Sequence, residues 1–263
     1  MTYLYKTYCF FKENDLPKTS KIRIYVEIDD IKIGETINPL KEQVHYLLSV
    51  MRLSDGEKIL IFNGISGEFE CRVCINGKKD LALQIIQKTR DFLSVPDVWL
   101  LFSPLKKDRT DFVIEKATEL GVAKIIPVIT RYTIAEKIKT QRWKAQAIEA
   151  SEQSRRVEIP KISAPVEISD LLSKWDAKRK LFFMDETGNG QNFNQALQKA
   201  TAPIALLVGP EGGFSEQELE MLKSCPFASG ISLGPRILRA ETAAIAALSC
   251  WQLIQGDWQK GDK

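Results

Sequence analysis

The sequence predicts an α/β protein in which a small β-rich domain precedes a larger domain built on a parallel sheet. Residues 96–263 alternate short apolar runs of strand type with helical patterns, whereas residues 1–90 hold several alternating runs and a single helical stretch. We therefore expect one domain over 1–90 and a second over 91–263. At 263 residues the chain is long enough for each domain to have a core of its own.

The β-rich part is expected to form a small barrel. Its predicted strands cover 22–28, 58–62, 69–73 and 81–86, and its one helix covers about 40–52. Asn63-Gly64 and Asn76-Gly77 are hairpin signals between these strands. A small barrel of this kind often serves to hold oligonucleotides.

The second domain is predicted from buried-type strands that alternate with helices. The strands are expected at 98–102, 124–129, 181–184, 204–208 and 231–233, and the helices at 111–120, 141–153 and 241–254. Gly121 is a natural residue to end the first of these helices. Ser215 and Glu218 form a capping-box signature that opens a further helix.

Composition and residue counts exclude several classes of protein. The content of 44% hydrophobic and 27% charged residues is that of a globular protein, and no apolar run is long enough to span a membrane. The N-terminus lacks the pattern of a signal peptide, so we expect a cytoplasmic protein. Cys71 and Cys74 would point to opposite faces of a strand. His45 is the only histidine and is expected to be a surface or structural residue. We therefore expect no metal site and no Ser-His-Asp catalysis.

Two matching turns near the C-terminus give the strongest functional signal. The runs 204–208 and 231–233 stop at Gly-Pro, in Gly209-Pro-Glu-Gly-Gly213 and in Gly234-Pro-Arg-Ile-Leu-Arg239. Proline ends a strand sharply, and glycine lets the backbone approach a ligand closely. Two ordinary strand-to-helix turns would also fit. Their content of Gly, Glu and Arg favours a binding cleft, on adjacent strand ends, of the type found in open α/β sheets.

The composition of these loops limits the ligand. The first loop has no lysine to reach a phosphate, and its Glu211 would repel one. Gly188-Asn-Gly190 starts like a dinucleotide fingerprint, but Phe193 occupies the place of the third glycine. Backbone amides beside a carboxylate suit a neutral base and a cationic group, and S-adenosylmethionine has both.

The two loops and several further segments resemble the RsmE family of bacterial methyltransferases. The loop signatures are Leu207 to Ser215 and Leu233 to Ala244. The resemblance extends over about 22–258 and includes Glu115-Lys-Ala-Thr-Glu-Leu-Gly-Val122 and His45-Tyr-Leu-Leu-Ser-Val-Met-Arg52. Members of this family methylate N3 of a uridine in small-subunit (16S) ribosomal RNA and belong to the SPOUT superfamily.

The resemblance implies a PUA-like RNA-binding barrel, a SPOUT domain with a deep trefoil knot, and a homodimer that acts on ribosomal RNA of the small ribosomal subunit. It also implies S-adenosyl-L-methionine as the cofactor, bent into the knot. The residues that it assigns to the cofactor are Phe183, Met184, Leu207, Val208, Gly209, Pro210, Gly212, Gly213, Ser232, Leu233, Gly234, Ile237, Leu238 and Thr242.

The chemistry of uridine N3 selects the catalytic candidates. N3 carries a proton near neutral pH, so a base must accept that proton and a cation must stabilise the charge on O2 and O4. Arg239, Arg236 and Glu211 are the candidates, and Glu241 is a weaker one. The alternative is that these side chains form ion pairs that only brace the fold.

The basic residues supply candidates for RNA contacts, although the net charge of +3 is mild. The candidates are Arg23, Arg52, Lys106, Lys107, Arg109 and Arg155. Two other functions remain open: a 2′-O-ribose methyltransferase of the same superfamily that acts on transfer or ribosomal RNA, and a non-catalytic RNA-binding protein of ribosome assembly. The position of the methyl group and the binding of cofactor distinguish these alternatives.

Overall fold

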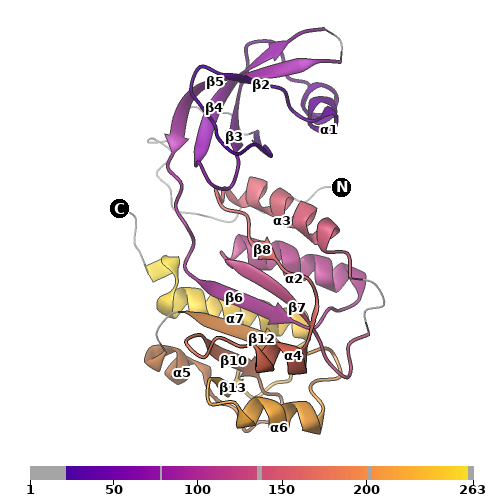
Figure 1. Cartoon of the computed structure of the whole chain (residues 1–263), viewed down its shortest axis with the longest axis vertical. Helices are drawn as coiled ribbons and strands as arrows, with labels where there is room; N and C mark the ends of the chain where they lie inside the picture. Colours follow the sequence, from indigo (N-terminus) through magenta and orange to yellow (C-terminus); the bar gives the residue numbers. More distant parts are fainter. Residues whose placement is uncertain (1–21, 78, 135–137, 201–202, 260–263) are drawn as a thin grey trace. The chain divides into compact units, whose positions relative to one another are not determined.

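The computed structural model describes residues 22–77, 79–134, 138–200 and 203–259, and the chain divides into two compact units, Met1–Asp91 and Phe92–Lys263 (Figure 1). Each unit has its own hydrophobic core. The expectation that the N-terminus is no signal peptide concerns residues outside the described range.

The first unit is a five-stranded sheet with the order β1-β3-β4-β5-β2. Its strands are β1 (Arg23–Tyr25), β2 (Thr36–Ile37), β3 (Lys58–Phe62), β4 (Glu68–Ile75) and β5 (Leu81–Arg90). β1 runs parallel to β3, and the other pairs are antiparallel. The helix α1 (Lys41–His45) continues as one turn of π-helix over Tyr46–Val50, and it contributes Val44 and Leu47 to the core of this unit.

Both predicted hairpins are confirmed. β3 pairs with β4 and β4 pairs with β5, in each case across a five-residue connection. Asn63 shapes the first connection because its side-chain oxygen accepts hydrogen bonds from the backbone N–H groups of Ile65 (3.1 Å) and Ser66 (2.7 Å). Such an Asx turn replaces the tighter two-residue turn that Asn-Gly often forms. Of the two roles expected for His45, surface or structural, the structure favours the first, because the side chain is exposed.

The second unit is an eight-stranded sheet, and all of its described strand pairs are parallel. The main path is β11-β13-β10-β12-β6-β7-β8, and β9 pairs with β7. The strands are β6 (Val98–Phe102), β7 (Lys124–Ile129), β8 (Lys161–Ile162), β9 (Val166–Glu167), β10 (Lys180–Met184), β11 (Gln191–Asn192), β12 (Ile204–Val208) and β13 (Ala228–Ser232).

Helices cover both faces of this sheet (Figure 1). One face packs against α2 (Lys107–Glu119), α3 (Thr140–Ser154), α5 (Phe193–Lys199) and α7 (Ala240–Gln255). The other face packs against α4 (Ile168–Ser173) and α6 (Glu216–Ser224), and a 3₁₀ turn, Asp257–Gln259, follows α7. The architecture is therefore the predicted α/β type with a parallel sheet.

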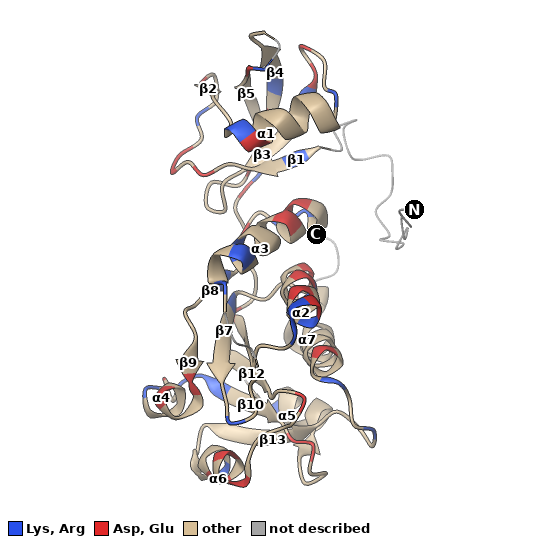
Figure 2. Cartoon of the chain, turned by 90° about the vertical axis from the view of Figure 1, so that its right-hand side faces the viewer, with Lys and Arg blue, Asp and Glu red and all other residues tan. Residues whose placement is uncertain are grey.

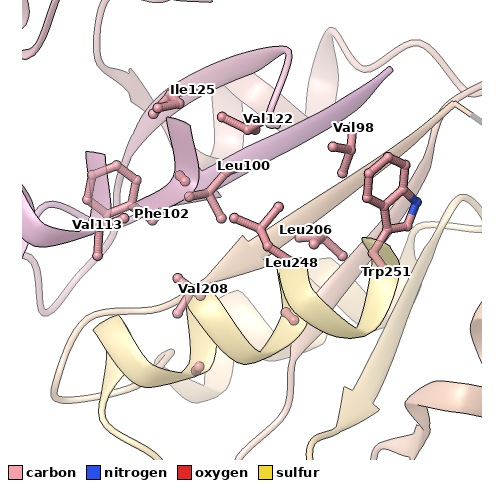
Figure 3. Packing of buried hydrophobic residues seen from close by; sticks show 14 of the residues in the cluster. Val98, Leu100, Phe102, Val113, Val122, Ile125, Leu206, Val208, Leu248 and Trp251 are labelled. Atoms are coloured by element: carbon pink, nitrogen blue, oxygen red, sulfur yellow. The ribbon is translucent and has the colours of Figure 1, made fainter. Parts of the chain in front are cut away.

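The alternation of side chains along the strands produces these two layers. Leu100 and Leu206 point towards α7, where they meet Leu248 and Trp251 (Figure 3). Their neighbour Leu101 points to the other face. Burying a leucine side chain of this size stabilises the fold by about 1.5–3 kcal/mol.

Two predicted boundaries differ from the structure for physical reasons. α2 begins at Lys107 rather than at 111, and its N-cap, Lys106, makes no side-chain cap hydrogen bond that a sequence pattern would reveal. β13 begins at Ala228 rather than at 231. Gly230 is a poor strand former, but a Cβ there would lie 3.0 Å from the ring of Phe183, so close packing selects glycine.

The described part of the chain has no helix that is long and apolar enough to cross a membrane. Among the same residues, no group of three or more His, Cys, Asp or Glu side chains is placed to hold a metal ion.

The two strands that carry the glycine loops are both interior strands of the sheet. β12 lies between β6 and β10, and β13 lies on the far side of β10. The knot that the resemblance implies stays a prediction.

Candidate active site at the carboxyl ends of three strands

Three neighbouring parallel strands, β13, β10 and β12, end at the same edge of the sheet. The first glycine loop, 209–213, leaves β12, and the second, 233–239, leaves β13. The expectation of adjacent strand ends is corrected here, because β10 separates the two strands. The residues that follow β10 therefore lie between the two loops and form part of the candidate site.

The first loop brings its backbone close to other segments. Gly209 and Pro210 are buried, and the N–H of Gly213 donates to the carbonyl of Pro210 at 3.0 Å. Gly213 has φ +69°, which favours glycine, and a Cβ at this position would collide with the carboxylate of Glu186. The loop thus brings its main chain directly against an acidic side chain.

The second loop is anchored at both ends and exposed in the middle. Leu233 and Leu238 pack against the core, whereas Ile237 is 84% exposed. Arg236 and Arg239 are exposed and make no ion pair with any residue that the structure describes. The two guanidinium groups are therefore available for a ligand at this edge.

Sequence reasoning missed the acidic pair Asp185-Glu186, which follows β10 directly. Asp185 is 7% exposed, and its Oδ1 accepts a hydrogen bond from the backbone N–H of Thr187 at 2.9 Å. Its Oδ2 would lie 3.1 Å from a Cβ at Gly230. Two carboxylates at a strand end can be seen in the sequence. The strand order, which places them between the two loops, cannot.

An arginine of α2 connects the two loops. Nη1 of Arg109 lies 3.0 Å from Oε1 of Glu211 in the first loop, and its Nε lies 3.7 Å from Oε1 of Glu241 in the first turn of α7. The alternative in which Arg239 braces the fold by pairing with either carboxylate is therefore wrong for the described structure. Arg109, which the sequence predicts as an RNA contact, pairs with both carboxylates instead.

The remaining predicted cofactor residues lie around the same three strand ends, except that Thr242 is exposed in the first turn of α7. Phe183 is buried in β10, and Met184, the last residue of that strand, is half-buried. A cavity of about 430 Å³ lies beside the first loop. It is lined by Arg131, Tyr132, Thr133, Ile134 and Gly212.

The predicted RNA-binding residues are distributed over both units. Lys106 and Lys107 are exposed at the start of α2, and Arg155 is exposed with φ +60° at the end of α3. Arg52 belongs to the first unit, where it follows the π-helical turn with φ +54°. Figure 2 shows how basic and acidic residues are distributed over the elements of each unit.

Arg23 requires a correction. Its side chain is 4% exposed, its Nε lies 2.5 Å from Oε2 of Glu68, and its guanidinium stacks 3.7 Å above the ring of Phe62. Arg90 pairs with the same carboxylate at 2.6 Å. A guanidinium enclosed in this way has a structural role, and Arg23 is not part of the RNA surface proposed below.

Comparisons with known proteins show the family to which the chain belongs. The sequence profile described as RNA methyltransferase domain matches residues 93–252, and the one described as RNA methyltransferase PUA domain matches residues 41–86. The chain is 35% identical over 213 residues to ribosomal RNA small subunit methyltransferase E of Rickettsia conorii, which covers 80% of this chain and 86% of that protein.

Two further relatives extend the similarity over nearly the whole chain. The protein of the same name from Bacillus subtilis is 30% identical over 256 residues, covering 89% of this chain and 99% of that protein. The crystal structure of a ribosomal RNA small subunit methyltransferase E from Neisseria gonorrhoeae, bound to S-adenosyl methionine, superposes with a TM-score of 0.81 at 30% identity. It covers 90% of this chain and 99% of that one. The chain therefore belongs to the ribosomal RNA small subunit methyltransferase E family.

Proposed function

We propose that this protein transfers a methyl group from S-adenosyl-L-methionine to N3 of a uridine in small-subunit ribosomal RNA. The observation that carries the proposal is the pair of glycine loops on either side of β10, in a chain whose fold matches the gonococcal enzyme solved with this cofactor. The names of the relatives from Rickettsia conorii and Bacillus subtilis support small-subunit ribosomal RNA as the substrate.

The residues around the three strand ends fit the cofactor. In the proposal, Phe183 and Met184 form an apolar wall beside the adenine. Backbone groups of the glycine loops bind the adenine itself, and they are those around Leu207, Gly209, Leu233 and Leu238. The close approach of Gly213 to Glu186 puts a carboxylate where a cationic group is favoured. S-adenosylmethionine, when bound, supplies an electrophilic methyl group on a positively charged sulfur.

Two exposed arginines suit the charge that develops on the uracil. When N3 loses its proton, negative charge spreads to O2 and O4, and a planar guanidinium can donate two hydrogen bonds to such oxygens. Arg239 and Arg236 lie in the second loop with no described ion pair to hold them elsewhere. We assign Arg239 this role, with Arg236 as its neighbour.

Glu211 is proposed as the proton acceptor, and Arg109 as the residue that positions it. The ion pair between Arg109 and Oε1 of Glu211 fixes the direction of the carboxylate and leaves Oε2 for a proton. Oε2 of Glu241 is buried and has no hydrogen-bond partner among the described residues. Glu241 therefore stays the second candidate.

The protein is further proposed to act as a homodimer in the cytoplasm, with the first unit holding RNA. Apolar side chains on α2 and α7 support a partner surface, because Phe112 is 44% and Leu253 is 61% exposed although the two helices pack together. Light scattering at micromolar concentration tests the dimer, and a fully active monomer would contradict it.

Mass spectrometry of ribosomal RNA tests the proposed function. A strain that lacks the protein should lose one methyl group from a uridine base in the small-subunit RNA, and the gene supplied in trans should restore it. Purified protein and labelled cofactor should restore the same methyl group to isolated subunits. A methyl group mapped to the ribose, or unchanged RNA in the deletion strain, would reject the proposal.

A further inference from the structure

A second cavity, of about 360 Å³, lies beside the candidate site, between the start of α2 and the start of α3. Pro104 and Leu105, which follow β6, form one wall, and Trp143 of α3 forms another. Lys107 lines this cavity, whereas Arg109, two residues further along α2, pairs with Glu211. The cavity is therefore a neighbour of the proposed reaction centre and not part of it.

Four cationic side chains line this single cavity: Lys106, Lys107, Lys139 and Arg142. The three lysines are exposed and make no ion pair with a described residue. Like charges around one cavity repel one another, so these side chains do not stabilise the structure while the cavity is empty. Their arrangement favours an anionic ligand such as a phosphate group.

One acidic side chain in the cavity indicates that the ligand also carries a hydrogen-bond donor. Oδ2 of Asp111 accepts a hydrogen bond from Nη2 of Arg142, whereas its Oδ1 is buried and has no partner among the described residues. A buried carboxylate oxygen without a partner costs free energy. A phosphate diester cannot donate a hydrogen bond, so the missing donor belongs to another part of the ligand.

The size and the apolar walls of the cavity match one nucleotide. Leu105 and Trp143 are 4% and 5% exposed, and together with Ile138 they offer apolar surface for a sugar or a base. A volume of about 360 Å³ is at the lower end of the range for small-ligand pockets, roughly 300–1,000 Å³. A ribonucleotide combines the required phosphate, apolar faces and 2′-hydroxyl donor.

We infer that this cavity binds one nucleotide of the RNA strand that flanks the target uridine, with its phosphate on Lys106, Lys107 and Lys139 and its 2′-hydroxyl on Asp111. The inference rests on the proposed function and extends it, because it adds a subsite for the neighbouring nucleotide. A carboxylate that binds the 2′-hydroxyl at this position would let the enzyme discriminate RNA from DNA.

The first test compares a short single-stranded RNA with the DNA of the same sequence, using the quenching of tryptophan fluorescence as the readout. The wild-type protein should bind the RNA about 5- to 10-fold more tightly, the value of one hydrogen bond. Asp111→Ala should bring this ratio close to one. Trp143→Phe should abolish most of the quenching. Equal RNA and DNA affinities in the wild-type protein, or an unchanged ratio in Asp111→Ala, would overturn the inference.

The second test separates the cavity from the reaction centre. Lys139→Glu should raise the KM for ribosomal RNA about tenfold or more while kcat changes little, because a lost phosphate contact weakens binding. Lys178→Glu is the matched control, since this exposed lysine precedes β10 at the opposite edge of the sheet. Equal KM values for the two variants would overturn the inference and leave the proposed function intact. A wild-type protein that binds RNA as expected but methylates none would reject the proposed function alone.

Discussion

Arg109 and Glu211 lie 102 positions apart in the chain, and their side chains meet at 3.0 Å. The contact ties α2 to the first glycine loop, and the weaker approach of Arg109 to Glu241 extends it to α7. The side chains of Arg109 and Glu211 are 36% and 28% exposed, and at such exposure an ion pair contributes little to stability. The pair is therefore expected to act through the position of the carboxylate.

Arg109→Ala should reduce methyl transfer with little loss of stability. Without the guanidinium, Glu211 is no longer held in one direction, and a misplaced group of this kind lowers the rate by about 100-fold. The measurement is single-turnover methylation at saturating cofactor, beside the midpoint of urea unfolding. Lys116→Ala, which removes a paired cation from the same helix, is the control and should keep the rate. An unchanged rate with a lowered midpoint would make Arg109 purely structural.

Gly213→Val should weaken the binding of S-adenosylmethionine. The added side chain would displace the carboxylate of Glu186 from the loop, and φ +69° is strained for a β-branched residue. Gly56→Val is the matched control, because Gly56 lies in the first unit and has φ +82° but nothing within 4 Å of an added Cβ. Calorimetry with the cofactor measures the effect. Equal affinities for the two variants would place the cofactor elsewhere.

Local patterns in the sequence predicted most of the fold and the two loops. The capping box at Ser215 is confirmed, since Ser215 and Glu218 exchange hydrogen bonds of 2.8–3.3 Å. The limits of β6, β7 and β12 also match the prediction, because each strand consists of apolar residues except for Lys124 at the start of β7. α4 and α5 escaped prediction because helices of six and seven residues are too short to show a period.

The site could be predicted only in part, because its key relationships join distant segments. No local pattern places β10 between β12 and β13, so the acidic pair at its end went unnoticed. The burial of Arg23 likewise depends on Glu68, 45 positions away. An arginine that pairs with a distant carboxylate, as Arg23 does with Glu68, is not available at the surface, and the sequence alone does not reveal such a pair.

Arg156→Met should lower the stability of the second unit by about 3 kcal/mol. The buried guanidinium donates to the carbonyl oxygens of Thr118 and Val122 at 2.8–3.0 Å, and hydrogen bonds from charged groups are strong. Burial lowers the pKa of Arg156 to about 10, so the charged form still prevails at neutral pH. Arg155→Met, at the exposed neighbour, is the control. If Arg156→Met and Arg155→Met lowered the free energy of urea unfolding equally, the buried hydrogen bonds of Arg156 would not contribute to stability.

The first unit should lose stability in acid through Glu68. Burial raises the pKa of this carboxyl, but hydrogen bonds from Arg90 and Arg23 outweigh that effect, so its pKa lies below the ordinary value of 4.5. The stabilisation is therefore complete above pH 4.5 and is lost as the pH falls through the lower pKa of the folded state. Glu68→Gln should remove this acid-dependent loss, whereas Glu57→Gln should not. Identical pH profiles of the two variants would contradict the assignment.

Arg239 is the residue on which the proposed chemistry depends most. It is the N-cap of α7, and its backbone carbonyl accepts a hydrogen bond from Ala243 at 2.8 Å, so its main chain is fixed while its side chain is exposed. The described ion pairs of Glu211 and Glu241 are made by Arg109 and not by Arg239. Removing the Arg239 side chain should therefore leave the fold and the cofactor affinity unchanged.

The expected loss in Arg239→Ala falls on the rate of the chemical step. A donor that stabilises charge in a transition state contributes about 3–4 kcal/mol, which corresponds to a fall of roughly 100- to 1,000-fold in single-turnover methylation. Arg239→Lys should recover only part of this rate, because an ammonium group cannot make the planar two-donor contact. Arg236→Ala shows whether the neighbouring arginine shares the role. A folded, cofactor-saturated Arg239→Ala protein that reacts within a few-fold of the wild-type rate would remove Arg239 from the mechanism.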